Sequence, residues 1–401
     1  MATGDQIITN FPRETTMQEI AQALQTMAFT QSAKLENITT WDQISGLVRN
    51  EYAQKVFNFG DQFVEKWTDT AIPKEYEYPW RVNHFENVEL EDGEIVPGMF
   101  LQAHYAHPFG VQFSQARAFL RCPDGLAAGT YNVTLGAKWG DKDAQKDTTW
   151  QFTLTKPVPA GGCLGGFIQM PDLAASTWKV ISYAADRITK IETVPVTSGA
   201  GGTALGILQY AARNGNLNSM QETGYGWNRW KTSALRQYLN SNQPKGKWWT
   251  PQDDWDIAPD QLTTKDGFLC GLPGDLMKAL KTVKVVTYTN TVQDGGEEDI
   301  TYDKVFLPSL EQLFINPQIA GEGSVHEYWQ RRSGMKTKMQ QYQTYPNMIT
   351  YDVENHTSPQ YVRLRSAFRG NAYHAWFVNS SGHVNNNLAL FARRFSPLVV
   401  V

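Results

Sequence analysis

This sequence is poor in charge, and its basic residues are scattered. Charged residues make up 19% of the 401 positions, below the usual level of about 25%. The 36 basic and 40 acidic residues give a net charge of −4, and the longest basic clusters, Arg331-Arg332 and Arg393-Arg394, are only pairs. Because binding to nucleic acid through its phosphates needs a basic surface, we expect no nucleic-acid partner.

Long apolar runs and paired cysteines are missing as well. No stretch of about 18 apolar residues occurs, and the first residues lack the basic start and apolar core of a secretory signal. We therefore expect synthesis in the cytoplasm and no membrane insertion. Cys122, Cys163 and Cys270 are odd in number and lack CxxC spacing, so we expect small buried side chains rather than a disulfide framework.

The motifs of common enzymes and metal sites are incomplete. His104 and His107 in HYAH have no third ligand at a recognisable spacing, and HEYW at His326 has Gln330 where HExxH needs a second histidine. The glycine-rich segment at 199–206 lacks the GK[ST] ending of a phosphate loop. We expect no metal, no cofactor and no catalytic residue.

Aromatic side chains are abundant, at 12% with 13 Trp, and such rings serve both cores and recognition surfaces. At about 150 residues per domain, the length corresponds to roughly two to three domains. Changes in hydrophobic periodicity predict a helical attachment or oligomerisation segment at 1–69, an antiparallel β-sandwich or jelly roll at 70–202, and an α+β domain at 203–401. The predicted fold class is α+β and rich in β-strands.

Two amphipathic helices are predicted in the N-terminal segment, at 16–27 and 40–57. In the second, Thr40 or Asp42 is a candidate N-cap, and the residues expected to share its buried face are Trp41, Ile44, Leu47 and Val48. The segment serves either for docking and oligomerisation or simply packs on the rest of the protein.

Alternation of polar and apolar residues predicts strands at 78–85, 98–105, 116–122, 129–139 and 149–156. Farther along, we expect helices at 232–241, with a cap near Thr232 or Ser233, and at 272–283. A strand is expected at 283–292, a strand followed by a helix at 303–314, and a final strand at 395–401, which would hold the C-terminus in a sheet.

The C-terminal tail is unusually rich in asparagine. Five Asn fall within 371–387, among Tyr373, His374, Trp376, Phe377 and His383. Rigid aromatic rings combined with adaptable polar side chains are typical of recognition surfaces. The alternative is a set of turns, in which Asn tolerates left-handed backbone.

Several spaced blocks of the C-terminal half together resemble one known family. The blocks are WKTSALRQYLNS at 230–241, VFLPSLEQLF at 305–314, VRLRS at 362–366 and the Asn-rich tail at 371–387. This succession resembles the C-type-lectin-like variable proteins that diversity-generating retroelements target in phages and prophages of gut bacteria. The family often ends in a Gly-Val-Arg-Pro-Ala-like strand, and the corresponding stretch here, Arg394 to Leu398, retains only the proline.

The resemblance implies a lectin-like scaffold whose tail, about 366–396, displays a hypervariable ligand-binding surface. In such systems template adenines are mutagenised, so Asn codons change to many types but not to Trp, which makes Trp376 part of the scaffold. The implied ligand-binding residues are Phe368, Arg369, Asn371, Tyr373, His374, Phe377, His383, Asn387, Leu388, Leu390, Phe391, Arg393 and Arg394. The calcium-binding tripeptides EPN, QPD and WND are absent, so the resemblance brings neither calcium nor sugar specificity.

The predicted function is that of a non-enzymatic, virion-associated binding protein that attaches to a host-surface protein or glycan. Its expected partners are other virion proteins and further copies of the chain, which by analogy with such proteins would form a trimer. Two alternatives stay open: a structural capsid or tail decoration protein, and a carbohydrate-processing virion enzyme that uses Asp253, Asp254 and Asp256 as paired carboxylates.

Overall fold

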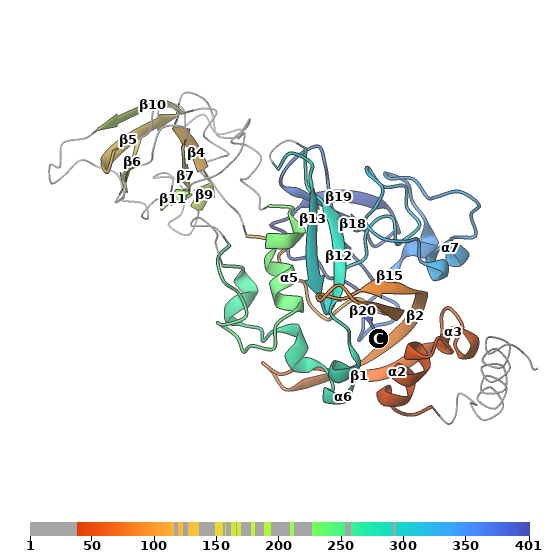
Figure 1. The fold of residues 1–401 in the computed structure, drawn as a ribbon. Helices are drawn as coiled ribbons and strands as arrows, with labels where there is room; N and C mark the ends of the chain where they lie inside the picture. Colours follow the sequence, from red (N-terminus) through yellow and green to blue (C-terminus); the bar gives the residue numbers. More distant parts are fainter. Residues whose placement is uncertain are drawn as a thin grey trace, which may run out of the picture.

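The computed structural model describes residues 38–115, 227–252, 258–291 and 294–401, and the pairing of short strands between residues 119 and 211 (Figure 1). The helix predicted at 16–27, the glycine-rich segment at 199–206 and the acidic trio Asp253, Asp254 and Asp256 lie outside the described residues.

Short helices punctuate the described chain. The α-helices are α2 (Trp41–Arg49), α3 (Ala53–Val56), α5 (Ala234–Leu239), α6 (Gly274–Ala279) and α7 (Glu327–Ser333). Single 3₁₀ turns are η4 (Trp230–Thr232), η5 (Asp260–Thr263), η6 (Phe268–Gly271) and η7 (Pro346–Met348).

Strands form most of the regular structure. The N-terminal strands are β1 (Gln62–Asp69), β2 (Lys74–Glu89) and β3 (Ile95–Ala103). The strands between residues 119 and 211 are β4 (Phe119–Cys122), β5 (Gly129–Leu135), β6 (Thr149–Leu154), β7 (Gly162–Gly165), β8 (Phe167–Gln169), β9 (Trp178–Val180), β10 (Ile188–Thr193) and β11 (Gln209–Ala211). The C-terminal half contains β12 (Val283–Tyr288), β13 (Glu298–Asp303), β14 (Val305–Phe306), β15 (Thr350–Tyr351), β16 (Pro359–Gln360), β17 (Val362–Ala367), β18 (His374–Val378), β19 (Val384–Leu388) and β20 (Leu398–Val400). All strand pairs in these sheets are antiparallel, which confirms the prediction of a β-rich α+β fold.

The helix predicted at 40–57 is divided in two: α2 ends at Arg49, Glu51 takes a positive φ of 59°, and α3 begins at Ala53. Thr40 is the N-cap: its hydroxyl accepts the backbone N–H of Gln43, and the Gln43 side chain accepts the backbone N–H of Thr40. This capping box satisfies two of the free donors at a helix N-terminus. The side chains spaced three and four residues apart all face the core, namely Trp41, Ile44, Leu47 and Val48.

The largest sheet has the strand order β1-β2-β3-β20-β14 and joins the two ends of the described chain. The C-terminal strand β20 lies between β3 and β14, with Val399 opposite both Leu101 and Val305. At the last residue, Val401 and Met99 exchange two backbone hydrogen bonds of 3.1 and 3.0 Å. The final strand is therefore held in a sheet, as predicted, and this sheet unites segments that periodicity assigned to different domains.

The strands between residues 119 and 211 pair among themselves. Their sheets have the orders β10-β5-β6, β11-β7-β4 and β8-β9. Figure 1 shows β4, β5, β6 and β10 together, apart from the five-stranded sheet. Predicted strands at 116–122, 129–139 and 149–156 correspond to β4, β5 and β6.

In the C-terminal half, helices α5 and α6 occur where the sequence predicts them, with Ser233 as the N-cap of α5. The helix expected after β14 is wrong: residues 310–314 form only hydrogen-bonded turns. The Ser309 and Gln312 side chains bond to each other's backbone N–H, and Phe314 then takes a positive φ of 60°. That left-handed conformation does not continue a right-handed helix.

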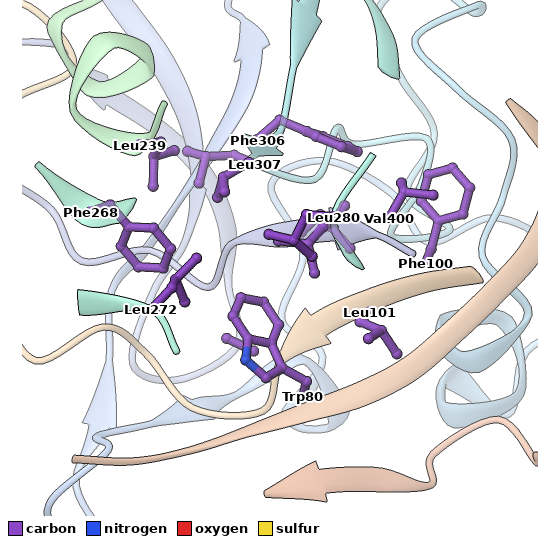
Figure 2. Packing of buried hydrophobic residues seen from close by; sticks show 14 of the residues in the cluster. Trp80, Phe100, Leu101, Leu239, Phe268, Leu272, Leu280, Phe306, Leu307 and Val400 are labelled. Atoms are coloured by element: carbon purple, nitrogen blue, oxygen red, sulfur yellow. The ribbon is translucent and has the colours of Figure 1, made fainter. Parts of the chain in front are cut away.

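The main hydrophobic core lies where the five-stranded sheet meets the helices of the C-terminal half. Figure 2 shows Trp80, Leu101 and Val400 of this sheet near Phe268, Leu272 and Leu280, which come from η6, the segment after it and the end of α6. No helix among the described residues is long and apolar enough to cross a membrane.

Candidate functional site

The Asn-rich tail folds as a three-stranded antiparallel sheet with the order β17-β18-β19. Ala375 lies opposite Asn387, Phe377 opposite Asn385, and Arg363 opposite Phe377. Residues directly opposite each other in a sheet share a face. Alternate residues of the tail therefore point to two different faces, one with a buried centre and one partly open.

The buried face is apolar. Trp376, Val378 and Val384 are 0 to 3% exposed and pack with Leu364 in a second hydrophobic cluster. Trp376, which the codon argument assigned to the scaffold, is completely buried and donates from its indole N–H to Gln318 at 3.3 Å. Large buried side chains on this face thus anchor the backbone of the tail.

The opposite face, with the loop that follows β19, carries a cluster of aromatic, amide and cationic side chains. We call it the Arg393 face, and its residues are Tyr361, Phe377, Asn385, Asn387, Phe391 and Arg393. The Tyr361 and Phe377 rings stack, with centroids 5.7 Å apart at an interplanar angle of 27°. The Arg393 guanidinium carbon lies 4.5, 5.8 and 5.4 Å from the ring centroids of Tyr361, Phe377 and Phe391, in that order, within the range of cation–π attraction.

Exposure differs within this face. Phe377 is 4% exposed, whereas Tyr361 and Phe391 are 37 and 42% exposed. Phe377 therefore forms the floor of the face, and the two outer rings are available for contact. The amides of Asn385 and Asn387 and the guanidinium of Arg393 are half-buried around them.

Arg363 lies beneath the Arg393 face and fixes its backbone. Its guanidinium is 1% exposed and donates to four carbonyl oxygens, those of Ala375, Asn387, Leu388 and Phe391, at 2.7 to 3.4 Å. Burial, and then the positive charge of Arg393, lowers the pKa of Arg363 to about 9. One buried side chain thus ties β18, β19 and the loop after β19 together.

The β17–β18 turn is held by asparagine side chains. The fully buried Asn228 amide nitrogen lies 2.7 to 2.9 Å from the carbonyl oxygens of Phe368, Asn371 and His374. The Asn371 side chain accepts the backbone N–H groups of Tyr373 and His374. Both asparagines hold the turn in place. Asn371 therefore fits the alternative expectation that the asparagines of the tail form turns.

Other residues expected on a single surface are spread over different sides of the tail. Phe368 packs against Trp376, and the Arg369 guanidinium donates to the carbonyl oxygens of Thr289 and Gly296. His374 shares the opposite face with Trp376 and contacts Asn386, while His383 contacts Thr344. Tyr373, Leu388 and Leu390 are half-buried, and Arg394 forms an ion pair with Asp352.

The structure therefore brings together Phe377, Asn387, Phe391 and Arg393 of the predicted set, and it adds Tyr361 and Asn385. The sequence could have predicted Asn385 as a member of this face, because it alternates with Asn387 along one strand. Tyr361 precedes the tail, and nothing in the sequence spacing pointed to its stack on Phe377.

His104 and His107 of the HYAH segment each lie within hydrogen-bonding distance of other side chains. His107 is fully buried between the hydroxyls of Tyr78 and Tyr238, each 3.2 Å away. His104 lies 3.3 Å from the Arg81 guanidinium. Among the residues that the structure describes, no group of three His, Cys, Asp or Glu side chains could hold a metal ion. Cys270 is half-buried and unpaired.

Comparison with known proteins finds one family. Residues 202–395, just under half of the chain, are similar to the family described as Domain of unknown function (DUF6273). The matched stretch begins beside the predicted domain boundary at 202/203 and includes the whole Arg393 face. No curated protein and no solved structure matches the chain.

Proposed function

We propose that this protein is a non-enzymatic binding protein of a phage particle, which presents the Arg393 face to a ligand on a host-cell surface. The observation that carries the proposal is the arrangement of two exposed rings, two amides and a guanidinium on one face of a sheet whose other face is anchored by the buried Trp376, Val378 and Val384. Aromatic, Asn and Arg side chains are the types that recognition surfaces favour.

The mechanism is display on a rigid backbone. Trp376 anchors the sheet from one side, and Arg363 and Asn228 hold its backbone carbonyls from the other. Side chains that make none of these anchoring contacts, such as Asn387 and Phe391, can change without loss of the strand register. This separation of scaffold from contact residues is what a diversified tail of the C-type-lectin-like variable type requires.

Weak binding at one face would be strengthened by repetition. A trimer, or many copies on one particle, raises the effective concentration of the second and third faces after the first has bound, by about 10²- to 10⁴-fold in avidity. We include such an oligomer in the proposal, with other virion proteins as its attachment points.

The test is sequencing of this gene in a mixed population, together with the DNA beside it. We expect a near-identical template next to a reverse-transcriptase gene, and substitutions confined to template adenines within codons 366–396. Codons of Asn387, Phe391 and Arg393 should vary, and the Trp376 codon should stay constant. A uniform tail with no template would contradict diversification and favour a fixed adhesin or a decoration protein.

A further inference from the structure

The polar groups of the Arg393 face are hydrogen-bond donors. The Asn385 side-chain oxygen accepts the backbone N–H of Asn386 at 2.8 Å, and the Asn387 oxygen accepts that of Leu388 at 2.7 Å. Each amide oxygen thus already accepts one hydrogen bond, whereas the two NH₂ groups make none to a described residue. A guanidinium has donors only, so Arg393 adds to the same set.

The Arg393 face also carries positive charge that no nearby carboxylate of the described residues neutralises. Within the described parts of the chain, no carboxylate lies within 4.0 Å of the Arg363 or Arg393 guanidinium. The Arg393 Nε is buried and has no hydrogen-bond partner there. Two like charges thus lie close together, and an anion bound at the open side of the Arg393 guanidinium would relieve the repulsion between them.

The edge of the sheet is closed to an added peptide strand. Val384 and Tyr342 already pair through backbone hydrogen bonds, as do Val384 and Gln343. Farther along β19, the N–H groups of Asn386 and Leu388 are occupied by the neighbouring Asn side chains. A peptide that recognises a sheet edge needs those backbone groups free, so the ligand must bind to side chains on the face.

We propose that the Arg393 face binds a carboxylate-bearing sugar of a surface polysaccharide, an inference that rests on the proposed binding function. The carboxylate pairs with Arg393, whose fork of donors suits a two-oxygen contact. The apolar face of the sugar ring packs on Tyr361 and Phe391, and its hydroxyl oxygens accept hydrogen bonds from Asn385 and Asn387. A sugar acid supplies all three features in one small unit.

The experiment measures binding of the full chain to oligosaccharides that contain galacturonic, glucuronic or sialic acid, by calorimetry in low and high salt. Each sugar acid is paired with its methyl ester, which keeps the ring and removes the charge. A poly-glutamate peptide is the third probe. The variants are Arg393→Gln and the double variant Tyr361→Ala/Phe391→Ala, and Arg49→Gln, an exposed arginine on α2, is the matched control.

We expect at least one sugar acid to bind, with affinity reduced at least tenfold by methylation, by Arg393→Gln and by the double variant. Arg49→Gln should bind as the parent does. Equal binding of acid and ester, binding of poly-glutamate alone, insensitivity to Arg393→Gln, or no binding of any sugar acid at 1 mM (on the order of the weakest specific affinities) would each overturn the sugar-acid inference. Because population sequencing tests diversification without any ligand, failure of one proposal is distinguishable from failure of the other.

Discussion

The Arg393 guanidinium lies 4.5 Å from the centroid of the Tyr361 ring, and Tyr361 in turn stacks on Phe377. These three residues come from the segment before β17, from β18 and from the loop after β19. Their contact shows that the tail and the segment before it form one surface. The buried Phe377 and Arg363 support this surface from inside the protein. We expect the side chains that hold this surface to differ from those that it displays in their effect on stability.

We expect Arg363, but not Arg393, to stabilise the fold. Arg363→Met would leave four carbonyl oxygens without their donor, so we expect the free energy of unfolding to fall by about 2 to 4 kcal/mol. Arg393→Gln, the matched control on the open side, should change it by less than about 0.5 kcal/mol. Urea denaturation of both variants measures the difference, and similar losses for the two would contradict the assignment.

Asn228 should control the order of the β17–β18 turn. Asn228→Ala removes the donor shared by the carbonyls of Phe368, Asn371 and His374, and we expect a loss of about 1 to 3 kcal/mol. Hydrogen exchange in residues 368–374 should accelerate more than in β2. The exposed Asn242 supplies the control Asn242→Ala, which should leave exchange unchanged. Unaltered protection of the turn in Asn228→Ala would refute this role.

The centre of the five-stranded sheet should not tolerate charge. Val399 is completely buried between β3 and β14, whereas Val64 on the edge strand β1 is 64% exposed. Val399→Asp would bury a carboxylate without a partner, and we expect a loss of at least about 4 kcal/mol. Val64→Asp should stay within about 0.5 kcal/mol. Thermal unfolding followed by circular dichroism distinguishes the two, and equal stability of both variants would show that β20 is dispensable.

Stability should fall as the pH drops below about 6.5. Burial lowers the pKa of His107 and of His326 well below the ordinary value, and both imidazole nitrogens of His326 lack a hydrogen-bond partner in the described structure. The folded state therefore binds fewer protons than the unfolded state, so the free energy of unfolding rises with pH. Each such histidine contributes a slope of about 1.4 kcal/mol per pH unit below the unfolded pKa, as long as it stays neutral when folded.

His84 has the opposite effect on the pH dependence of stability. Burial lowers its pKa, but hydrogen bonds to Glu86 and Glu327 outweigh burial and raise it overall, so its contribution is present at low pH and is lost as the pH rises through the folded pKa. Urea titrations between pH 5 and 8, a range set about the ordinary histidine pKa, should give a shallower slope for His326→Phe than for the parent. The exposed His356 provides the variant His356→Gln, with which the slope of His326→Phe is compared. An unchanged slope in His326→Phe would contradict the prediction.

Local patterns of the sequence were sufficient for the individual elements. The spacing of Trp41, Ile44, Leu47 and Val48, with Thr40 before them, defines α2 because cap and buried stripe lie within one short segment. The alternation in β5 and β6 and the apolar run of β20 are likewise local. Where the backbone becomes left-handed, as at Phe314, periodicity alone predicted a helix that does not form.

The partners of these elements were decided only in three dimensions. Nothing local to Leu398–Val400 states that it pairs with β3, because hydrogen bonding between strands depends on register and on long-range packing. The same holds for the site: composition pointed to the tail, and the predicted set included Phe377, Asn387, Phe391 and Arg393. The stack of Tyr361 on Phe377, the donors of Asn385 and the buried guanidinium of Arg363 follow from the sheet, since only folding brings those side chains to one face.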